Sequence, residues 1–266
     1  MPEAGGALAS LAKPHPGREV SSFLGPSRSI VPPHHQPERS PGTASSLERL
    51  WDTAEVRELR AGEHLFRAGS LATCVYKVES GAFRLYRFAP HRGDRRHIVD
   101  FLLPRDIIGL EICDRCPLSA QAIMTSRTRR VPKSVLTRSR SKAGNDSGLL
   151  LDLVETLSVQ LSSTRELLLV VSRRNCEESL AAFLANLSRR NELQGADPRI
   201  ISLPMSRGDL ADYLGVTVET VSRIFKRLKQ RHLITSVGRH RVVVRDLDSL
   251  RTFITAGAAD TAGQVD

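Results

Sequence analysis

Hydrophobic and polar positions follow different periods in successive stretches of the chain. The first stretch, residues 47–60 (LERLWDTAEVRELR), has helical spacing and predicts a short amphipathic helix. From residue 62 onward, apolar and polar residues alternate in short runs that glycines interrupt. These runs predict strands at residues 64–66, 74–78, 82–88, 97–102 and 119–132. Short strands separated by turn glycines are typical of an antiparallel roll or barrel.

The period changes again near residue 146, where apolar residues recur at steps of four and three. This heptad spacing predicts a helix of about 26 residues, ~39 Å long, with Asp146 as its cap. A helix with one such seam packs on its own domain or pairs with a second copy of itself. Its length and its place between two domains favour a dimer helix. The seam residues are Leu150, Val154, Leu157, Leu161, Leu168 and Val171, with Thr164 as a polar interruption.

After an amphipathic helix at residues 175–193, the segment 206–230 (SRGDLADYLGVTVETVSRIFKRLKQ) has the pattern of two helices joined by a tight turn. Ser206 and Asp209 have the spacing of a capping box, and Gly215 suits a left-handed turn. Thr217 is placed to cap the second helix. Together with the small residue Ala211, this spacing predicts a helix-turn-helix motif.

The second helix of this motif carries side chains that suit the reading of DNA bases. Arg223 can pair bidentately with guanine, Glu219 can accept from a cytosine amino group, and Ser222 suits either role. Val218, at the helix tip, suits a thymine methyl group. Glu219 and Arg223 are also four residues apart, so an intrahelical salt bridge is an alternative that coexists with base reading.

Other residues around the motif suit the phosphate backbone. The run 235–244 (TSVGRHRVVV) predicts a hairpin with a basic turn, which would act as a wing beside the helices. A last helix is expected after Asp246. The predicted phosphate contacts are Ser206, Arg207, Thr217, Thr220, Lys226, Arg227, Arg239 and Arg241.

This pattern divides the chain into an N-terminal arm (1–46), a roll (47–145), a dimerisation helix (146–173) and a winged helix-turn-helix domain (174–266). Eight of the 14 prolines lie in residues 1–43, so we expect the arm to be disordered. His34 and His35 have no third ligand nearby, and no metal site is predicted. Strands in the roll and helices in the other parts, segregated along the chain, predict the α+β fold class.

The chain carries 39 Lys+Arg against 29 Asp+Glu, a net charge of +10, of which residues 206–245 hold 9 − 3 = +6. This concentration makes double-stranded DNA the leading anionic partner. A second basic run, residues 127–142, is interpreted as a solvated strand edge and turn. We find no secretory signal, membrane-length apolar run, catalytic nucleophile–base set or phosphate-binding loop. We therefore expect a cytoplasmic protein that is not an enzyme.

The combination of glycine-punctuated roll, heptad helix and VETVSR in a helix-turn-helix resembles the CRP/FNR family of bacterial transcription regulators over residues 47–255. Glu219, Ser222 and Arg223 match the Glu-x-x-Ser-Arg signature of its FNR-like branch. FLLPRDIIGLE followed by LSAQAI is most similar to the FixK-like group, except that Arg105 stands where that group has glycine. The resemblance implies a cyclic-nucleotide-binding-like jelly roll and a homodimer on an inverted repeat like TTGAT–N4–ATCAA. It also implies RNA polymerase as a partner and activation of microaerobic respiration or nitrogen-fixation genes.

The sensing chemistries of that family leave alternatives open. Cyclic-nucleotide sensors hold a phosphate with an Arg-Ser pair, and here Leu118 stands where that arginine belongs. Residues 1–73 contain no cysteine, so the N-terminal iron–sulfur ligands of oxygen sensors are absent. Cys113 and Cys116 form one Cys-x-x-Cys pair, a candidate redox site. We expect no cofactor; the alternatives are a regulator that responds to a cyclic nucleotide, to haem or to thiol oxidation.

Overall fold

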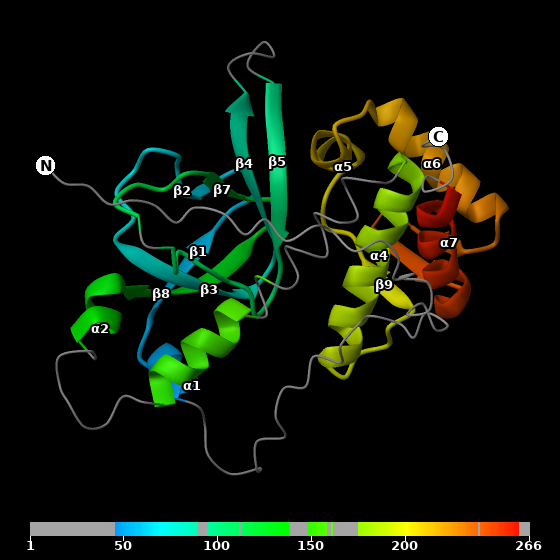
Figure 1. The fold of residues 1–266 in the computed structure, drawn as a ribbon. Coiled ribbons are helices and arrows are strands. Elements are labelled where there is room, and N and C mark those ends of the chain that lie inside the picture. Colours follow the sequence, from blue (N-terminus) through cyan, green and yellow to red (C-terminus); the bar gives the residue numbers. More distant parts are fainter. Residues whose placement is uncertain are drawn as a thin grey trace, which may run out of the picture. The chain divides into compact units, whose positions relative to one another are not determined.

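The computed structural model describes residues 46–89, 95–111, 113–138, 148–158, 161, 175–238 and 240–260 (Figure 1). The predicted arm therefore lies almost wholly outside the described residues. The N-terminal elements are α1 (Ser46–Asp52), β1 (Glu55–Leu59), β2 (His64–Phe66), β3 (Cys74–Ser80), β4 (Phe83–Ala89), β5 (Arg95–Leu102), β6 (Ile107–Ile108), β7 (Ser119–Ala122), β8 (Ser126–Pro132) and α2 (Lys133–Arg138). The C-terminal elements are α4 (Cys176–Leu193), β9 (Ile200–Ser202), α5 (Arg207–Leu214), α6 (Val218–Gln230), β10 (Ile234–Val237), β11 (Arg241–Val244) and α7 (Leu247–Asp260).

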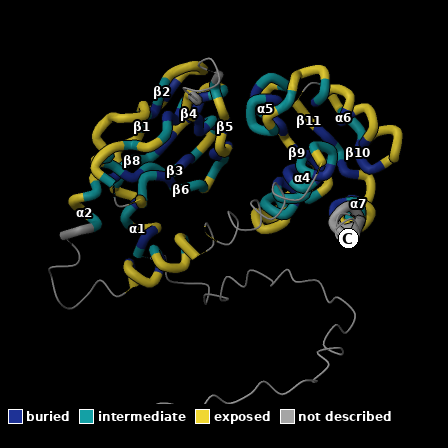
Figure 2. The backbone as a smooth tube through the Cα atoms, turned by 45° about the horizontal axis from the view of Figure 1, so that its top comes forward, coloured by how far each residue is buried: buried dark blue, intermediate teal, exposed yellow. Residues whose placement is uncertain are grey.

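The N-terminal strands form two four-stranded antiparallel sheets, in the orders β1-β8-β3-β6 and β2-β7-β4-β5. Apolar side chains from both sheets meet in one buried cluster, in which Leu59 and Val78 come from the first sheet and Phe83 and Leu102 from the second. The burial pattern in Figure 2 follows this arrangement, with buried positions along the strands. The predicted antiparallel roll is therefore confirmed.

The prediction of one helix over residues 47–60 is wrong in its second half. The helix α1 ends at Asp52, and residues 55–59 form β1, which pairs with β8 so that Glu55 lies opposite Arg130 and Leu59 opposite Ser126. Leu59 is only 1% exposed. Pairing with a sheet and burial of this leucine outweigh the helical preference of Glu-Val-Arg-Glu-Leu.

The prediction of one strand over residues 119–132 is also wrong, because β7 and β8 belong to different sheets. The chain turns between them, where Ser126 Oγ donates to the Met124 carbonyl at 2.7 Å. Ser126 also closes on the β3–β4 turn at Gly81, where a Cβ atom would lie 2.6 Å from the Ser126 Cα. Gly81 has φ +85°, so this turn requires glycine for both space and backbone conformation.

Arg105 lies in the turn between β5 and β6 with φ +77°, a left-handed conformation that favours glycine. Its backbone N–H donates to the Val78 carbonyl at 2.8 Å, and Asp106 N–H donates to the Leu103 carbonyl at 3.0 Å. These hydrogen bonds hold the turn on β3 despite the unfavourable residue. The departure from the FixK-like pattern therefore falls at a position of real backbone strain.

The helical residues 148–158 have two different apolar faces. Leu149 is buried with Leu47 and Trp51 of α1, and the Asp152 carboxylate accepts a hydrogen bond from Leu47 N at 3.0 Å. The described seam residues lie on the other face and are 46–59% exposed: Leu150, Val154, Leu157 and Leu161. The seam positions Thr164, Leu168 and Val171 and the cap Asp146 lie outside the described residues.

The C-terminal part contains the small antiparallel sheet β10-β11-β9, in which β9 contacts α4 and β10 contacts α6. Asn175 caps α4 by accepting from the backbone N–H groups of Glu177 and Glu178. Leu180, Leu184, Leu228 and Leu250 are fully buried in the core of this part. This core supports the two helices and the hairpin that the sequence analysis singled out.

Candidate nucleic-acid interface

The helices α5 and α6 form the predicted helix-turn-helix. Ser206 Oγ accepts from Asp209 N at 3.0 Å, and Asp209 Oδ2 accepts from Ser206 N at 3.0 Å, which completes a capping box at the start of α5. Gly215 ends α5 with φ +70°, and Thr217 Oγ1 caps α6 by accepting from Thr220 N at 3.2 Å. The three capping residues and the turn glycine of the sequence prediction are confirmed.

The two helices are held together by apolar residues of their inner faces. Leu210, Ala211, Val221 and Ile224 are at most 2% exposed. The outer face of α6 is left uncovered as a consequence.

The four predicted base-reading residues, Val218, Glu219, Ser222 and Arg223, are all exposed in the first half of α6. Ser222 Oγ donates to the Val218 carbonyl at 2.9 Å. Hydrogen bonds from its own backbone N–H and from the Thr217 side chain, together with the nearby charge of Arg223, lower the pKa of Glu219. No ion pair joins Glu219 to Arg223 in the described part of the chain, and both residues are exposed.

The seven predicted phosphate contacts that the structure describes fall into three groups. Ser206, Thr217 and Thr220 use their hydroxyls within the two caps. Arg207 and Arg227 have protein partners, since the Arg207 guanidinium lies over the Phe225 ring and Arg227 pairs with Glu177. Lys226 and Arg241 are exposed. Arg239 lies outside the described residues.

The wing follows α6 as predicted. In the β10–β11 hairpin, Ile234 lies opposite Val244 and Val237 opposite Arg241, and Gly238 between the strands has φ +68°. β9 adds a third strand by pairing with β11. Asp246 accepts from the backbone of Asp248 at the start of α7, in line with the predicted last helix.

The second basic run, residues 127–142, is partly compensated by two carboxylates where the structure describes it. Glu79 pairs with both Arg127 and Arg129, and Glu55 pairs with Arg130 at 2.8 Å. These carboxylates come from neighbouring strands of the same sheet. The interpretation as a strand edge is wrong, because β8 lies inside the sheet and pairs with β1 on one side and with β3 on the other.

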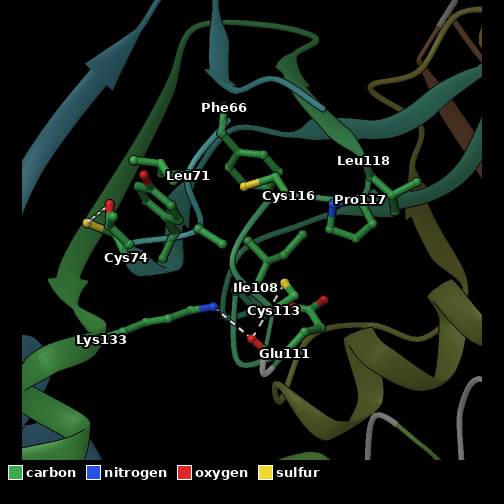
Figure 3. A pocket seen from close by; sticks show the side chains of 14 residues that line it. Phe66, Leu71, Cys74, Ile108, Glu111, Cys113, Cys116, Pro117, Leu118 and Lys133 are labelled. Atoms are coloured by element: carbon green, nitrogen blue, oxygen red, sulfur yellow. Dashed lines mark hydrogen bonds between the residues drawn. The ribbon is translucent and has the colours of Figure 1, made fainter. Parts of the chain in front are cut away.

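The roll contains a small cavity of about 30 Å³, lined by Phe66, Tyr76, Ile108 and Leu118 among others (Figure 3). A cavity of this size has room for about one water molecule. Leu118, which the resemblance aligns with the phosphate-binding arginine, packs against the apolar core of the roll. Lys133 also borders this cavity, and its ammonium group donates to the Glu111 carbonyl at 2.7 Å.

Three cysteines border the same cavity: Cys74, Cys113 and Cys116 (Figure 3). Cys74 Sγ lies 3.7 Å from Thr73 Oγ1, and Cys113 Sγ donates to the Glu111 carbonyl at 3.8 Å. All four cysteines of the chain are free thiols. Among the described residues, no group of three or more His, Cys, Asp or Glu side chains is arranged to hold a metal ion. The sequence did not predict that Cys74 would border the same cavity as Cys113 and Cys116.

A roll of this topology followed by a winged helix-turn-helix defines a DNA-binding transcription regulator. The model of the Crp-like helix-turn-helix domain matches residues 178–253, and that of the cyclic nucleotide-binding domain matches residues 56–140. The chain belongs to the CRP/FNR family of transcription regulators, which is a family of regulators rather than enzymes.

Individual relatives agree with this assignment. The fumarate and nitrate reduction regulatory protein of Vibrio cholerae is 32% identical over 203 residues, which cover 75% of this chain and 79% of that protein. The transcriptional activator protein FnrA of Stutzerimonas stutzeri is 34% identical over 210 residues, covering 76% and 81%. The structure of FixK2 from Bradyrhizobium japonicum matches with a TM-score of 0.66 and 32% identity, covering 75% of this chain and 96% of that one. The likeness to the FixK-like group is thus confirmed. None of the described helices is long and apolar enough to cross a membrane.

Proposed function

We propose that the protein is a homodimeric activator that binds an inverted repeat resembling TTGAT–N4–ATCAA and recruits RNA polymerase to genes of microaerobic respiration or nitrogen fixation. The observation that carries the proposal is the outer face of α6. It presents Glu219, Ser222 and Arg223, three exposed side chains with hydrogen-bonding groups at helical spacing, on a helix whose inner face is fixed in the core. Such an arrangement suits the major groove of DNA.

The homodimer is supported by the exposed seam on residues 148–161. Four apolar side chains at steps of four, three and four are solvent-exposed in the single chain, while Leu149 and Asp152 on the other face are packed against the roll. A continuous apolar stripe on a helix is a typical coiled-coil surface. Two recognition helices related by a two-fold axis would then enter successive major grooves about 34 Å apart.

The type of regulation follows from the relatives. Their names include an anaerobic regulatory protein of Haemophilus influenzae and the activator FnrA. These names support activation under low oxygen. The phosphate contacts that fit this function best are the exposed residues Lys226 and Arg241.

The test is selection of binding sites from random double-stranded DNA by the purified full-length protein. The expected result is a palindrome with TTGAT-like half-sites separated by four base pairs. A variant with Glu219→Ala and Arg223→Ala is the matched control and should enrich no such motif. Enrichment of a single unrepeated site, or of no sequence at all, would contradict the proposal.

The thiol-redox alternative is favoured by one observation, the presence of Cys74, Cys113 and Cys116 around one cavity. To test this alternative, DNA binding by the purified protein is measured with and without hydrogen peroxide. A change in DNA affinity on oxidation that Cys113→Ser and Cys116→Ser abolish would establish this response. An unchanged affinity would exclude it.

A further inference from the structure

The first helix of the helix-turn-helix is joined to the roll by two carboxylates and two arginines. Arg84 of β4 donates from Nη1 to Asp209 Oδ1 at 2.8 Å, and Arg96 of β5 donates from Nη2 to the same oxygen at 3.1 Å. Arg96 also donates to Asp212 Oδ2 from Nε at 3.0 Å and from Nη2 at 2.7 Å. The Asp209 side chain is only 3% exposed, so water does little to screen its pairs.

The arginine of β4 is itself held in place. Arg84 donates from Nε and Nη2 to Gln121 Oε1 at 3.0 and 2.7 Å, and Gln121 Nε2 donates to the Gly62 carbonyl at 2.7 Å. Because Nε and Nη2 are held by Gln121 and the guanidinium is planar, the direction of the remaining nitrogen, Nη1, is fixed. It therefore acts as a rigid donor toward Asp209.

Apolar contacts lie beside these ion pairs. Phe101 of β5 packs with Phe183 of α4 and Tyr213 of α5, with ring centroids 5.8 and 5.5 Å away, respectively. Further from α5, Arg190 of α4 donates to Asp106 at 2.8 Å. The roll and the helix-turn-helix thus meet through an aromatic cluster flanked by ion pairs.

The two oxygens of Asp209 have separate partners. Oδ2 accepts from Ser206 in the capping box, whereas Oδ1 accepts from Arg84 and Arg96. The same carboxylate therefore fixes the start of α5 and the attachment of α5 to the roll. Among the described residues, hydrogen bonds and ion pairs join the roll to α4 and α5 and none joins it to α6. The recognition face of α6 is free in the attached arrangement.

We propose that Arg84 and Arg96 are positioning residues for DNA recognition, which hold each helix-turn-helix on its roll in the orientation that sets the half-site spacing of the dimer. The proposal rests on the proposed function. In a two-fold dimer the distance between recognition helices depends on how each motif is attached to its roll. A motif that turns freely must lose that freedom on binding two half-sites at once, which lowers affinity.

The test compares the full-length protein with the double variant Arg84→Gln, Arg96→Gln, which keeps both the capping box and α6 intact. Binding is measured on the selected palindrome, on versions with the spacer lengthened or shortened by one and two base pairs, and on a single half-site. The variant is expected to bind the native spacing on the order of tenfold more weakly. It should bind the half-site as the parent does, and it should lose less affinity when the spacer changes.

Arg127→Gln is the matched control, because it removes a roll arginine whose partner is Glu79 within its own sheet. Arg96→Asp should weaken native-spacing binding, and adding Asp212→Arg should restore the spacing preference by reversing the pair. A double variant with unchanged spacing preference would overturn the inference, as would an equal loss on the half-site or a reversed pair that restores nothing. A parent protein that prefers no palindrome would instead refute the proposed function itself.

Discussion

The guanidinium of Arg207 lies over the ring of Phe225, 3.2 Å from its centroid. This contact joins the first turn of α5 to the middle of α6, so a residue that the sequence assigns to the phosphate backbone connects the two helices of the motif. Burial lowers the pKa of the Arg207 guanidinium, as expected for a cation partly removed from water. The positive charge is held in place by the face of the aromatic ring.

Replacement of Arg207 by Ala should therefore reduce stability more than it reduces electrostatic attraction to DNA. Loss of the stacking contact should lower the free energy of unfolding by about 0.5–2 kcal/mol, measured by urea denaturation. The slope of log affinity against log salt concentration should stay as in the parent protein. A slope smaller by about one would mean that Arg207 contacts a phosphate after all.

Arg241, by contrast, is exposed at the start of β11 in the wing. Its replacement by Ala should weaken binding to all DNA sequences and reduce the salt slope by about 0.9, because one phosphate contact is lost. Arg251→Ala, on α7, is the control. Equal salt slopes for Arg241→Ala and the parent would remove the wing from the interface.

Arg223 is expected to read a base. Arg223→Ala should cost about 1–3 kcal/mol at the selected site and relax the choice of base at the contacted guanine. Competition with single-base variants of the site measures this loss of discrimination. Gln230→Ala, at the exposed end of the same helix, should leave it unchanged. Uniform weakening on every site would show that Arg223 contributes charge alone.

Asp209 predicts a pH dependence of stability. Burial alone would raise the pKa of its carboxyl, but hydrogen bonds from Ser206 and the charges of Arg84 and Arg96 outweigh it and hold the pKa below the ordinary value. The stability that this ionised group contributes is therefore complete above the unfolded pKa of ~3.9 and is lost as pH falls through the lower folded value.

Denaturation of Asp209→Asn at a series of acidic pH values tests this expectation. The asparagine keeps one side-chain oxygen that can accept from Ser206 N, but it has no proton equilibrium. Its free energy of unfolding should be lower than that of the parent near neutral pH, and it should fall less steeply below pH ~4. Parallel pH profiles for the two proteins would rule out the contribution of Asp209.

The seam predicts the oligomeric state. Val154→Glu puts a charge in the middle of the exposed apolar stripe and should convert the dimer to a monomer, as measured by light scattering after size exclusion. Leu151→Glu is a close control, since Leu151 is 62% exposed and lies off the heptad positions. The same dimer mass in both variants would place the dimer contact elsewhere.

The elements that the sequence predicts best are those fixed by local chemistry. The capping box of Ser206 and Asp209, the turn at Gly215 and the cap at Thr217 depend on residues a few positions apart, and all are found in the structure. The helix assigned to residues 47–60 fails because the second half pairs with β8, more than 60 positions away. A local pattern carries no information on such a partner.

The site shows the same limit. Exposure of Glu219, Ser222 and Arg223 follows from helical periodicity and is predictable. The stacking of Arg207 on Phe225 and the pairing of Arg227 with Glu177 depend on how helices pack, so a local pattern could not predict them. Arg84 and Asp209 are 125 positions apart, so no motif could have joined them.

The pairing of the roll's basic run with Glu55 and Glu79 affects how the protein encounters DNA by diffusion. Glu55 and Glu79 offset two of the three charges on Arg127, Arg129 and Arg130, whereas residues 206–245 hold +6 of the net charge of +10. Electrostatic attraction to a polyanion is then expected to act most strongly on the helix-turn-helix and wing, which favours encounters on that side. Removing Glu79 would add a second attractive surface on the roll and increase the share of collisions that meet DNA with the wrong side.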